Sequence, residues 1–335
     1  MPPSIPPRVP FAGGGPARAH AAWRMPGEGG MRRRTLLGWA AGGVVAAGAG
    51  LGAWSFAWEP ALRLRLVRHR VAAAAWPEGM PPLRIACVAD PHLGGPHTPP
   101  ERLARAVALV NALEPDLVAV LGDFLADHRF VTRRPDMAEA AGILAGLRAP
   151  LGVHAVLGNH DWWEDPDAQA RRVPLPRAAA AFAAAGLPVL HNDARRLRHG
   201  ERELWVAGLG SQWAYLRRGA RGFDGADRLD EALAAVRDPA APVVLLAHEP
   251  DVFARPPPRR VALTLSGHTH GGQVRIAGWS PVVPSRYGNR YAWGHVEEAG
   301  RHLVVSGGIG NSLLPVRLGM PSEITLVELG GDAPA

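Results

Sequence analysis

The sequence contains no lysine, so all 37 of its basic residues are arginine. Because few other groups titrate above the histidines, a small surplus of arginine is enough to produce an isoelectric point of about 10.8. Most of the net charge of +7 lies in residues 1–58, which hold six arginines and one acidic residue. Residues 59–335 hold 31 arginines against 29 acidic residues, so specific nucleic-acid binding by a basic surface is not expected.

Cysteine is almost absent as well. The single Cys87 excludes an intramolecular disulfide, and its place in the apolar run 85–88 predicts a small buried hydrophobic side chain. With 335 residues, 47% of them hydrophobic, the chain is long enough for one large domain or two. No internal repeat is found, and residues 59–330 are predicted to form one domain.

The N-terminal region lacks the features of a folded domain. Residues 1–30 contain 13 proline or glycine residues, which predicts a disordered or untranslated extension with Met31 as an alternative start. Residues 35–58 carry no charge and are long enough to cross a bilayer. Because Arg33-Arg34-x-Leu-Leu precedes them, residues 31–58 resemble a twin-arginine export signal. No Ala-x-Ala cleavage site follows, so a retained membrane anchor is the other prediction; a buried core helix fits poorly.

Short apolar runs dominate the rest of the sequence, as in strands that are buried on both faces. They lie at residues 84–89, 117–121, 153–157, 243–247 and 261–265. Helices are predicted between and beside these runs from helical apolar spacing or from alanine content. They lie at residues 100–113, 136–148, 167–185 and 226–236. Alternating strands and helices predict an α/β fold.

Residues 62–66 alternate leucine with arginine, which favours a half-buried strand over a basic membrane-surface segment. Each later apolar run ends in a polar cluster, and strand carboxyl ends meet at one edge of such sheets. The clusters supply carboxylate, amide and imidazole groups but no thiolate. The candidate metal ligands are Asp90, His92, Asp123, Asn159, His248, His268 and His270.

This ligand set suits two divalent metal ions such as Mn, Fe, Zn or Co. Two ions ~3.5–4 Å apart share a carboxylate and stabilise both the attacking and the leaving oxygen of a phosphoryl transfer. The sequence therefore predicts a dinuclear metal centre.

The five clusters resemble, in order, the motifs of the calcineurin-like metallophosphoesterase family: D-x-H, G-D, G-N-H-D/E, H and G-H-x-H. The resemblance covers about residues 83–275. Residues 267–273 (GHTHGGQ) and 306–310 (SGGIG) are similar to the bacterial membrane- or wall-associated branch, which is often exported. The resemblance implies a four-layer α/β/β/α sandwich, with residues 62–67 and 323–329 completing the sheets.

The resemblance also implies a role for each motif residue. The residues that match the ligands of the first metal ion are Asp90, His92 and His270. Those that match the ligands of the second are Asn159, His248 and His268, and Asp123 matches the bridging aspartate. His160 is implied to contact the phosphoryl group and the leaving oxygen, with Asp161 orienting it. Pro91 and Gly307 depart from the branch; Gly307 replaces a common arginine that could contact substrate.

The implied activity is hydrolysis of phosphodiester or pyrophosphate bonds by a water that the metal ions activate. The paired tryptophans and the leader suggest a lipid-linked or cell-envelope substrate, a membrane contact through the N-terminal segment and an extracytoplasmic location. Trp162, beside Trp163, either lines a substrate cleft or packs under its loop, and Arg286 either contacts substrate or is solvated. A nuclease or nucleotide phosphodiesterase of the same fold and a non-catalytic scaffold are the alternative functions.

Overall fold

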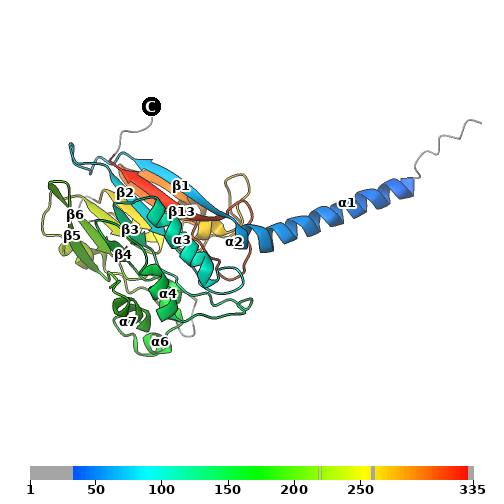
Figure 1. Ribbon diagram of the computed structural model, residues 1–335, viewed down its shortest axis with the longest axis horizontal. Helices are drawn as coiled ribbons and strands as arrows, with labels where there is room; N and C mark the ends of the chain where they lie inside the picture. The colour runs from blue at the N-terminus through cyan, green and yellow to red at the C-terminus, as the bar shows by residue number, and fades with distance from the viewer. Residues whose placement is uncertain (1–32, 218, 220, 258–260, 331–335) are drawn as a thin grey trace, which may run out of the picture. The chain divides into compact units, whose positions relative to one another are not determined.

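The computed structural model describes residues 33–217, 219, 221–257 and 261–330 (Figure 1). The predicted extension at residues 1–30 lies outside the described residues. The chain divides into two units, Met1–Ala49 and Gly50–Ala335. Helix α1 (Arg33–Ala53) holds the described residues of the first unit and continues into the second. There a π-helical turn, η1 (Trp54–Trp58), and helix α2 (Glu59–Leu62) follow it.

One helical stretch is long and apolar enough to cross a membrane. It spans Trp39–Leu62, 24 residues with a mean hydropathy of 1.3. Large apolar side chains along it, such as Trp39, Val44 and Leu51, are exposed. Exposed apolar side chains near an N-terminus are typical of an export signal or a membrane anchor.

The first sheet is built from the two ends of the folded body. It contains β1 (Leu64–Val71), β2 (Leu83–Val88), β3 (Leu117–Val120), β4 (Val153–Ala155) and β13 (Ser322–Leu329). Its order is β1-β13-β2-β3-β4. Strands β2, β3 and β4 are parallel, so their carboxyl ends share one edge, whereas β13 pairs antiparallel with β2.

The second sheet has a parallel centre and antiparallel edges. It contains β5 (Asp193–His199), β6 (Arg202–Gly208), β9 (Val243–Leu246), β10 (Leu263–Ser266), β11 (Gly294–Glu298) and β12 (Arg301–Val305). Its order is β11-β12-β10-β9-β6-β5. The parallel pairing of β6, β9, β10 and β12 again brings carboxyl ends to one edge. A small ribbon of β7 (Tyr215–Leu216) and β8 (Phe223–Asp224) lies outside both sheets.

The two sheets pack face to face through an apolar layer. Ile85 and Cys87 of β2 lie in this layer with Val206 of β6 and Leu246 of β9. The alternate residues of β2 face the other way, because side chains along a strand alternate between faces. Burial raises the pKa of the Cys87 thiol to about 12, so this cysteine is a buried neutral side chain, as predicted.

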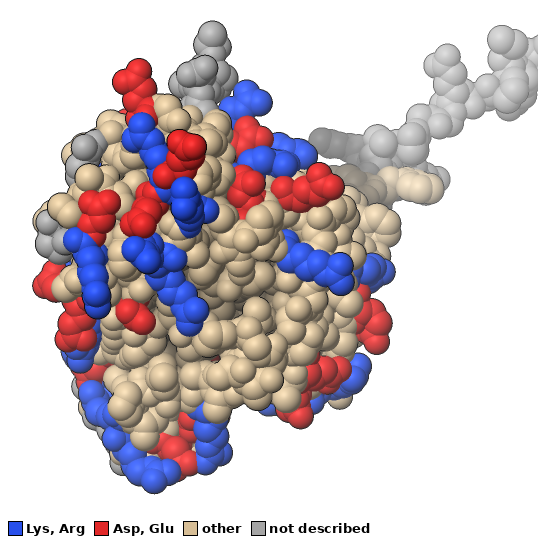
Figure 2. All heavy atoms as spheres, turned by 60° about the vertical axis from the view of Figure 1, so that its left-hand side comes forward, with Lys and Arg blue, Asp and Glu red and all other residues tan. Residues whose placement is uncertain are grey.

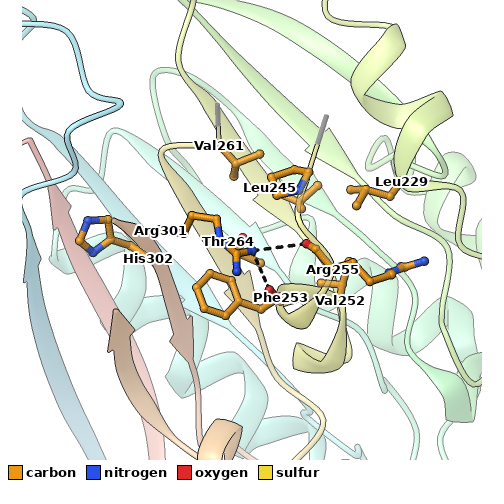
Figure 3. A pocket seen from close by; sticks show the side chains of 10 residues that line it. Leu229, Leu245, Val252, Phe253, Arg255, Val261, Thr264, Arg301 and His302 are labelled. Atoms are coloured by element: carbon orange, nitrogen blue, oxygen red, sulfur yellow. Dashed lines mark hydrogen bonds between the residues drawn. The ribbon is translucent and has the colours of Figure 1, made fainter. Parts of the chain in front are cut away.

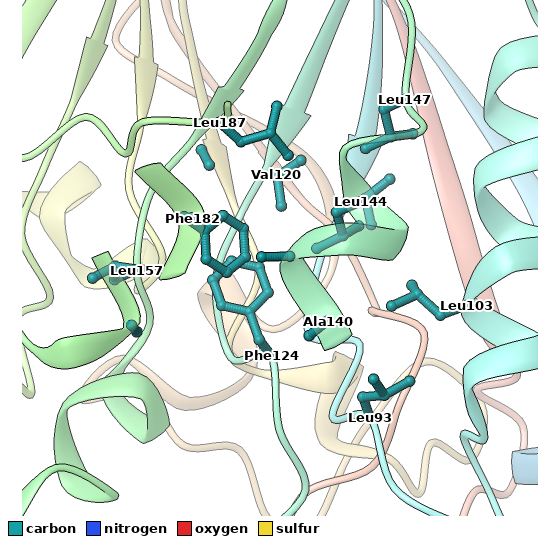
Figure 4. Packing of buried hydrophobic residues seen from close by; sticks show 14 of the residues in the cluster. Leu93, Leu103, Val120, Phe124, Ala140, Leu144, Leu147, Leu157, Phe182 and Leu187 are labelled. Carbon is teal, nitrogen blue, oxygen red and sulfur yellow. The ribbon is translucent and has the colours of Figure 1, made fainter. Parts of the chain in front are cut away.

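Helices cover the outer face of the first sheet. They are α3 (Pro100–Ala112), α4 (Met137–Leu144) and α7 (Arg177–Ala184). Figure 4 shows Leu103, Leu144 and Phe182 from these three helices pointing toward Val120 of β3, in one buried cluster. This apolar layer packs the three helices against the strands that precede the first polar clusters.

Shorter helices cover the second sheet. Leu229 and Leu233 of α8 (Leu229–Ala234) pack on β6 and β9. The 3₁₀ helix η2 (Pro250–Ala254) lies nearby, where Arg301 donates hydrogen bonds to the carbonyls of Phe253 and Arg255 (Figure 3). The cavity there holds about 10 Å³, room for about one water molecule. The four layers form the α/β/β/α sandwich, as predicted.

One local prediction was wrong. The alanine-rich stretch 167–185 forms two helices, α6 (Pro166–Arg171) and α7, because Pro174 and Pro176 between them cannot donate helical hydrogen bonds. The half-buried strand predicted at 62–66 is confirmed as β1, although it begins at Leu64 because Leu62 still belongs to α2.

Candidate metal centre

The first polar cluster brings together residues that are far apart in the sequence. Asp90 and His92 follow β2, and His270 begins the 3₁₀ helix η3 (His270–Gly272) after β10. Ligand atoms from all three lie within 4.8 Å of one another, and all three residues are buried. The two Nε2 atoms of His270 and His92 are 3.2 Å apart, and His270 Nε2 is 3.8 Å from Asp90 Oδ1. Ligands of one ion, each ~2.1 Å from it, lie about 3–3.5 Å apart.

The second cluster forms beside it from Asp123, His248 and His268, again with ligand atoms within 4.8 Å. These residues follow β3, β9 and β10. His248 Nε2 is 3.0 Å from Asp123 Oδ2. Two ligands of one cation lie about this far apart.

Asp123 lies between the two clusters. Its Oδ2 atom is 3.0 Å from His248 Nε2 and 3.7 Å from His92 Nε2. Its Oδ1 atom accepts a hydrogen bond of 2.9 Å from the backbone N–H of His160, which fixes the orientation of the carboxylate. The buried histidine and aspartate groups are therefore arranged as in a dinuclear metal site.

The residues fit such a metal pair by a further criterion. Asn159 Oδ1 and His268 Nε2 are buried and have no hydrogen-bond partner among the described residues. A buried polar atom without a partner costs about 1–3 kcal/mol, so native proteins rarely leave two in one site. Asn159 lines the same cavity as Asp123 and His268. A cation there would satisfy both atoms.

The protonation states of the candidate ligands differ. Burial opposes the charge of His248, but the carboxylate of Asp123 raises its pKa well above the usual value, so a metal ion would displace its proton. The two imidazoles that follow β10 suit metal binding directly. Burial lowers the pKa values of His268 and His270 well below the usual histidine value, so both imidazoles are neutral and keep a lone pair. Burial opposes the charge of Asp123 too, but the nearby histidines, His248 foremost, lower its pKa well below the usual value. Burial and the Asp123 charge raise the pKa of Asp90 to about 7, since two carboxylates compete for one buried site.

The backbone is strained at the candidate ligands. Positive φ angles occur at Asp90, His92, Asp123, His268 and His270. For residues other than glycine this conformation costs about 1–3 kcal/mol and clusters at functional sites. Backbone hydrogen bonds between strand ends hold it, including His92 N–H to the Asp123 carbonyl at 3.0 Å. The fold thus imposes the conformation that turns these side chains toward one another.

Two motif glycines permit the close approach of the loops. A Cβ atom on Gly158 would collide with Asp123 Oδ1 and lie 2.7 Å from His248 Cε1. A Cβ on Gly267 would collide with Asp90 Oδ2. Both glycines lie directly beside candidate ligands, so any larger residue would push a ligand out of place.

His160 lies at the edge of the site with a carboxylate partner. Its Nδ1 atom is 3.0 Å from Asp127 Oδ2, and its Nε2 atom is 3.3 Å from the Ser312 hydroxyl. Burial lowers the pKa of His160, but the carboxylates of Asp123 and Asp127 outweigh this effect and raise its pKa to about 9. The imidazole is therefore protonated at neutral pH.

Asp161 does not orient His160 as predicted. Its carboxylate accepts hydrogen bonds from the backbone N–H groups of Asp123, Phe124 and Gly158, at 2.8–3.0 Å. Asp161 lies in the first turn of α5 (Asn159–Trp163), and its side chain folds back toward the start of that helix. It holds the backbone on both sides of the centre, and Asp127 takes the orienting role.

A cavity of about 490 Å³ opens beside the centre. Asp123, Asn159, His160, His268 and His270 line its polar end. Its remaining wall is largely apolar. That wall includes Trp163, Trp213, Phe223, Val282, Leu313 and Leu314. The rings of Trp163, Phe223 and Trp213 stack in series, with centroids 5.1 and 4.6 Å apart.

The two predicted substrate contacts do not reach this cavity. Trp162 is fully buried in the core beneath α5, where it packs against Tyr215, and its neighbour Trp163 lines the cavity. Neighbouring residues on a helix point about 100° apart, so Trp163 faces the cavity when Trp162 points into the core. Arg286 is exposed and is not part of the cavity wall; its backbone N–H donates to Asp251.

Sequence reasoning also missed Arg317, which is fully buried below the centre. Its guanidinium donates hydrogen bonds to the carbonyls of Gly307, Gly310 and Met320. A buried arginine so far from any motif leaves no signal in one sequence. It positions the loop that passes beneath Asp90, where a Cβ on Gly308 would lie 2.8 Å from Asp90 Cβ.

The sequence matches the calcineurin-like phosphoesterases over residues 83–272. The chain belongs to this family. The matched region begins with β2 and ends at η3, so it contains every candidate ligand. Family membership and the buried clusters together make the protein a metal-dependent phosphoester hydrolase.

Three relatives illustrate the range of the family. The uncharacterised metallophosphoesterase YkuE of Bacillus subtilis is 28% identical over 89% of this chain and 98% of its own. The phosphodiesterase YaeI of Escherichia coli is also 28% identical, over 89% of this chain and 98% of its own. The UDP-2,3-diacylglucosamine pyrophosphatase LpxG of Chlamydia trachomatis is 24% identical over 58% of this chain and 65% of its own.

Proposed function

We propose that the protein hydrolyses a phosphodiester or pyrophosphate bond at a dinuclear metal centre. The observation that carries this proposal is the position of Asp123, whose Oδ2 atom lies between His92 and His248 and so between the two clusters. The first ion would be held by Asp90, His92 and His270, and the second by Asn159, His248 and His268. Asp123 would be a ligand of both ions.

The chain's own residues have distinct tasks in the reaction. When bound, two divalent ions activate water and offset the charge on the phosphoryl oxygens. His160, protonated and held by Asp127, is placed to hydrogen-bond a phosphoryl oxygen and to donate its Nε2 proton to the leaving oxygen. Asp161 keeps the backbone of Asp123 and Gly158 in register.

The cavity supports a substrate that joins a phosphate group to an apolar group. Its polar end lies at the candidate ligands, and its wall is formed by stacked aromatic rings and aliphatic side chains. An apolar wall of this kind favours a lipid-linked substrate, because a nucleic-acid backbone would require basic side chains there. The names of YaeI and LpxG cover both bond types, a phosphodiester and a lipid-linked pyrophosphate.

The surface charge favours a small substrate over a polyanion. On the face shown in Figure 2, basic and acidic side chains lie beside one another, without a broad basic patch. Exposed ion pairs, such as Arg172 with Asp224 and Arg196 with Glu203, also balance basic and acidic charge locally. The nuclease alternative predicts strong, salt-dependent DNA binding, and a salt-titrated binding assay with the purified protein tests it.

We also propose that the protein is exported by the twin-arginine route and retained at the membrane. The apolar stretch Trp39–Leu62 follows Arg33 and Arg34 closely, as in a signal of this type. We expect a reporter that must fold before transport to be exported when fused to residues 31–75. Export that persists after both arginines are changed to glutamine would contradict the twin-arginine route.

An activity panel tests the catalytic proposal. The full chain, purified in detergent and loaded with Mn²⁺, is assayed on bis(p-nitrophenyl) phosphate, p-nitrophenyl phosphate and a nucleotide-lipid pyrophosphate. Turnover of the diester or the pyrophosphate above that of the monoester is expected. The absence of turnover on both, in protein shown to contain two metal ions per chain, would contradict the proposal.

A further inference from the structure

A tight hairpin at residues 276–279 presents two large apolar side chains to solvent. Ile276 and Trp279 exchange backbone hydrogen bonds of 2.8 and 3.0 Å across a two-residue turn. The turn residues Ala277 and Gly278 both have positive φ angles, as in a type I′ turn. The side chains of Ile276 and Trp279 are 62% and 60% exposed. Paired residues of a hairpin point to the same face, so the two form one apolar tip.

Further exposed apolar side chains lie at the mouth of the cavity. Leu313 is 74% exposed and Val282 is 69% exposed, yet both also line the cavity beside the candidate metal centre. A side chain that is exposed and also lines a cavity marks the opening of that cavity. The cavity therefore opens between apolar residues of two loops.

These loops are tied to the hairpin and to the end of the apolar helix. Val274 and Arg275, at the base of the hairpin, pair with Leu318. The Gln273 side chain donates to the Leu314 carbonyl at 3.0 Å. The backbone N–H of Arg317 donates to the carbonyl of Ser55 in η1 at 2.8 Å, so the loop lies against the point where the apolar helix meets the folded body (Figure 1).

The helix end has the composition of a membrane surface anchor. Glu59 and Pro60 are buried in the folded body, so the stretch that can enter a bilayer ends at Trp58. At about 1.5 Å per residue, residues 39–58 span about 30 Å, the thickness of the hydrocarbon core. The last residues of this stretch are therefore expected in the interfacial layer, where tryptophan is enriched. Trp54, Phe56 and Trp58, which flank Ser55, are exposed.

We propose that the hairpin tip and the Val282 and Leu313 loops form a rim that rests in the lipid bilayer, so that a membrane-resident substrate enters the metal cavity directly from the bilayer. The occupant of this apolar surface is the lipid bilayer itself, since the loop that carries Leu313 and Arg317 contacts the end of the helix that reaches the bilayer. The rim rests on the proposed membrane anchoring, and its role in substrate access rests on the proposed lipid-linked substrate.

The contact with lipid is measured by site-specific labelling. Cys87 is buried, so an environment-sensitive dye can be attached at Ile276→Cys or Leu313→Cys in the full chain, reconstituted in phosphatidylcholine nanodiscs. The matched control is Glu201→Cys, exposed at the tip of the β5–β6 hairpin. We expect blue-shifted emission and quenching by nitroxide-labelled lipid at positions 276 and 313, and neither at position 201. Equal quenching at all three positions, or quenching at none, would overturn the rim.

Substrate access is measured with two substrates that share one leaving group. Hexadecyl p-nitrophenyl phosphate is embedded in the vesicle that carries the protein, and bis(p-nitrophenyl) phosphate is supplied in solution. The double variant Ile276→Glu, Trp279→Glu alters only the tip, which does not line the cavity. We expect hydrolysis of the embedded diester to fall about tenfold or more, because the tip loses its apolar burial, while hydrolysis of the soluble diester is unchanged.

The outcomes separate the rim from the proposed function. Loss of activity on the embedded diester alone supports the rim. Equal activity of wild type and variant on both substrates would overturn it and leave the phosphodiesterase intact. If the wild type hydrolyses neither diester, and does not hydrolyse the nucleotide-lipid pyrophosphate either, the proposed function fails, and the dye measurement still decides whether the rim contacts lipid. Quenching that appears only when another protein is added would assign the surface to a protein partner instead.

Discussion

The two sheets contribute different chemistry to the metal centre. The first sheet places two carboxylates, an amide and one imidazole at the ends of β2, β3 and β4, whereas the second places only imidazoles at the ends of β9 and β10. Each proposed metal position takes ligands from both sheets. The negative charge therefore comes from the first sheet alone, and both positions depend on the packing between the sheets.

The largest expected effect comes from removing charge on the first sheet. Asp123→Asn removes the carboxylate that both proposed metal positions share. The variant should lose several kcal/mol of transition-state stabilisation, which lowers kcat by about 10³-fold or more. Turnover of bis(p-nitrophenyl) phosphate and metal content by mass spectrometry provide the measurement. The control is Asp193→Asn, exposed on β5. Full activity of Asp123→Asn would contradict the shared-carboxylate assignment.

The next effect comes from the contact between the sheets. In Gly158→Ala, the new methyl group collides with Asp123 of the first sheet and approaches His248 of the second. We expect kcat to fall about 10²-fold, as for displacement of a reacting group by about 1 Å. Gly142→Ala, on α4 with open space around it, is the matched control and should keep full activity. A wild-type rate in both variants would show that the loops carrying Asp123 and His248 can move apart without loss of activity.

A smaller effect is expected from Asp127, which lies in the loop after β3 and outside the two proposed metal positions. Asp127→Asn removes a charge that raises the pKa of His160, so the pKa falls. Because His160 acts in its protonated form, the alkaline limb of the kcat profile should move to lower pH, and kcat at pH 8 should fall about 10-fold or more. If the alkaline limb does not shift, His160 is not the proton donor.

The smallest effect on activity is expected from the layer between the sheets. Leu246→Ala opens a cavity in that layer, and Leu245→Ala opens one on the outer face of the same strand. Each should lower the free energy of unfolding by about 2–5 kcal/mol. Only Leu246→Ala should also weaken metal binding, by up to about tenfold, because lost packing between the sheets lets the loop that carries His248 move. Metal titration by calorimetry compares the two; equal affinities would show that the centre is insensitive to the sheet spacing.

The sequence located the polar clusters but not all of their partners. The clusters are visible because each follows a short apolar run, and strands buried on both faces have no polar interruption. Strands β5 and β11 have half-exposed, charged patterns and gave no such signal. Asp127 was missed because it contacts His160 across a loop, and no local spacing encodes that contact.

The choice between neighbouring side chains also needed the structure. Trp162 and Trp163 are equivalent in the sequence, and the start of α5 decides that Trp162 enters the core and Trp163 faces the cavity. Asp161 is likewise equivalent to any motif carboxylate until the helix turns its side chain toward the backbone of Gly158 and Asp123.

The sequence by itself determined the ligand types, the family, the apolar N-terminal stretch and the near-neutral charge of the folded body, because these depend on local composition and order. Only the tertiary structure decided what orients His160, which of the paired tryptophans faces the cavity, and that the candidate ligands gather into adjacent buried clusters. Those features depend on contacts between residues tens to hundreds of positions apart, which form only when the two sheets pack together.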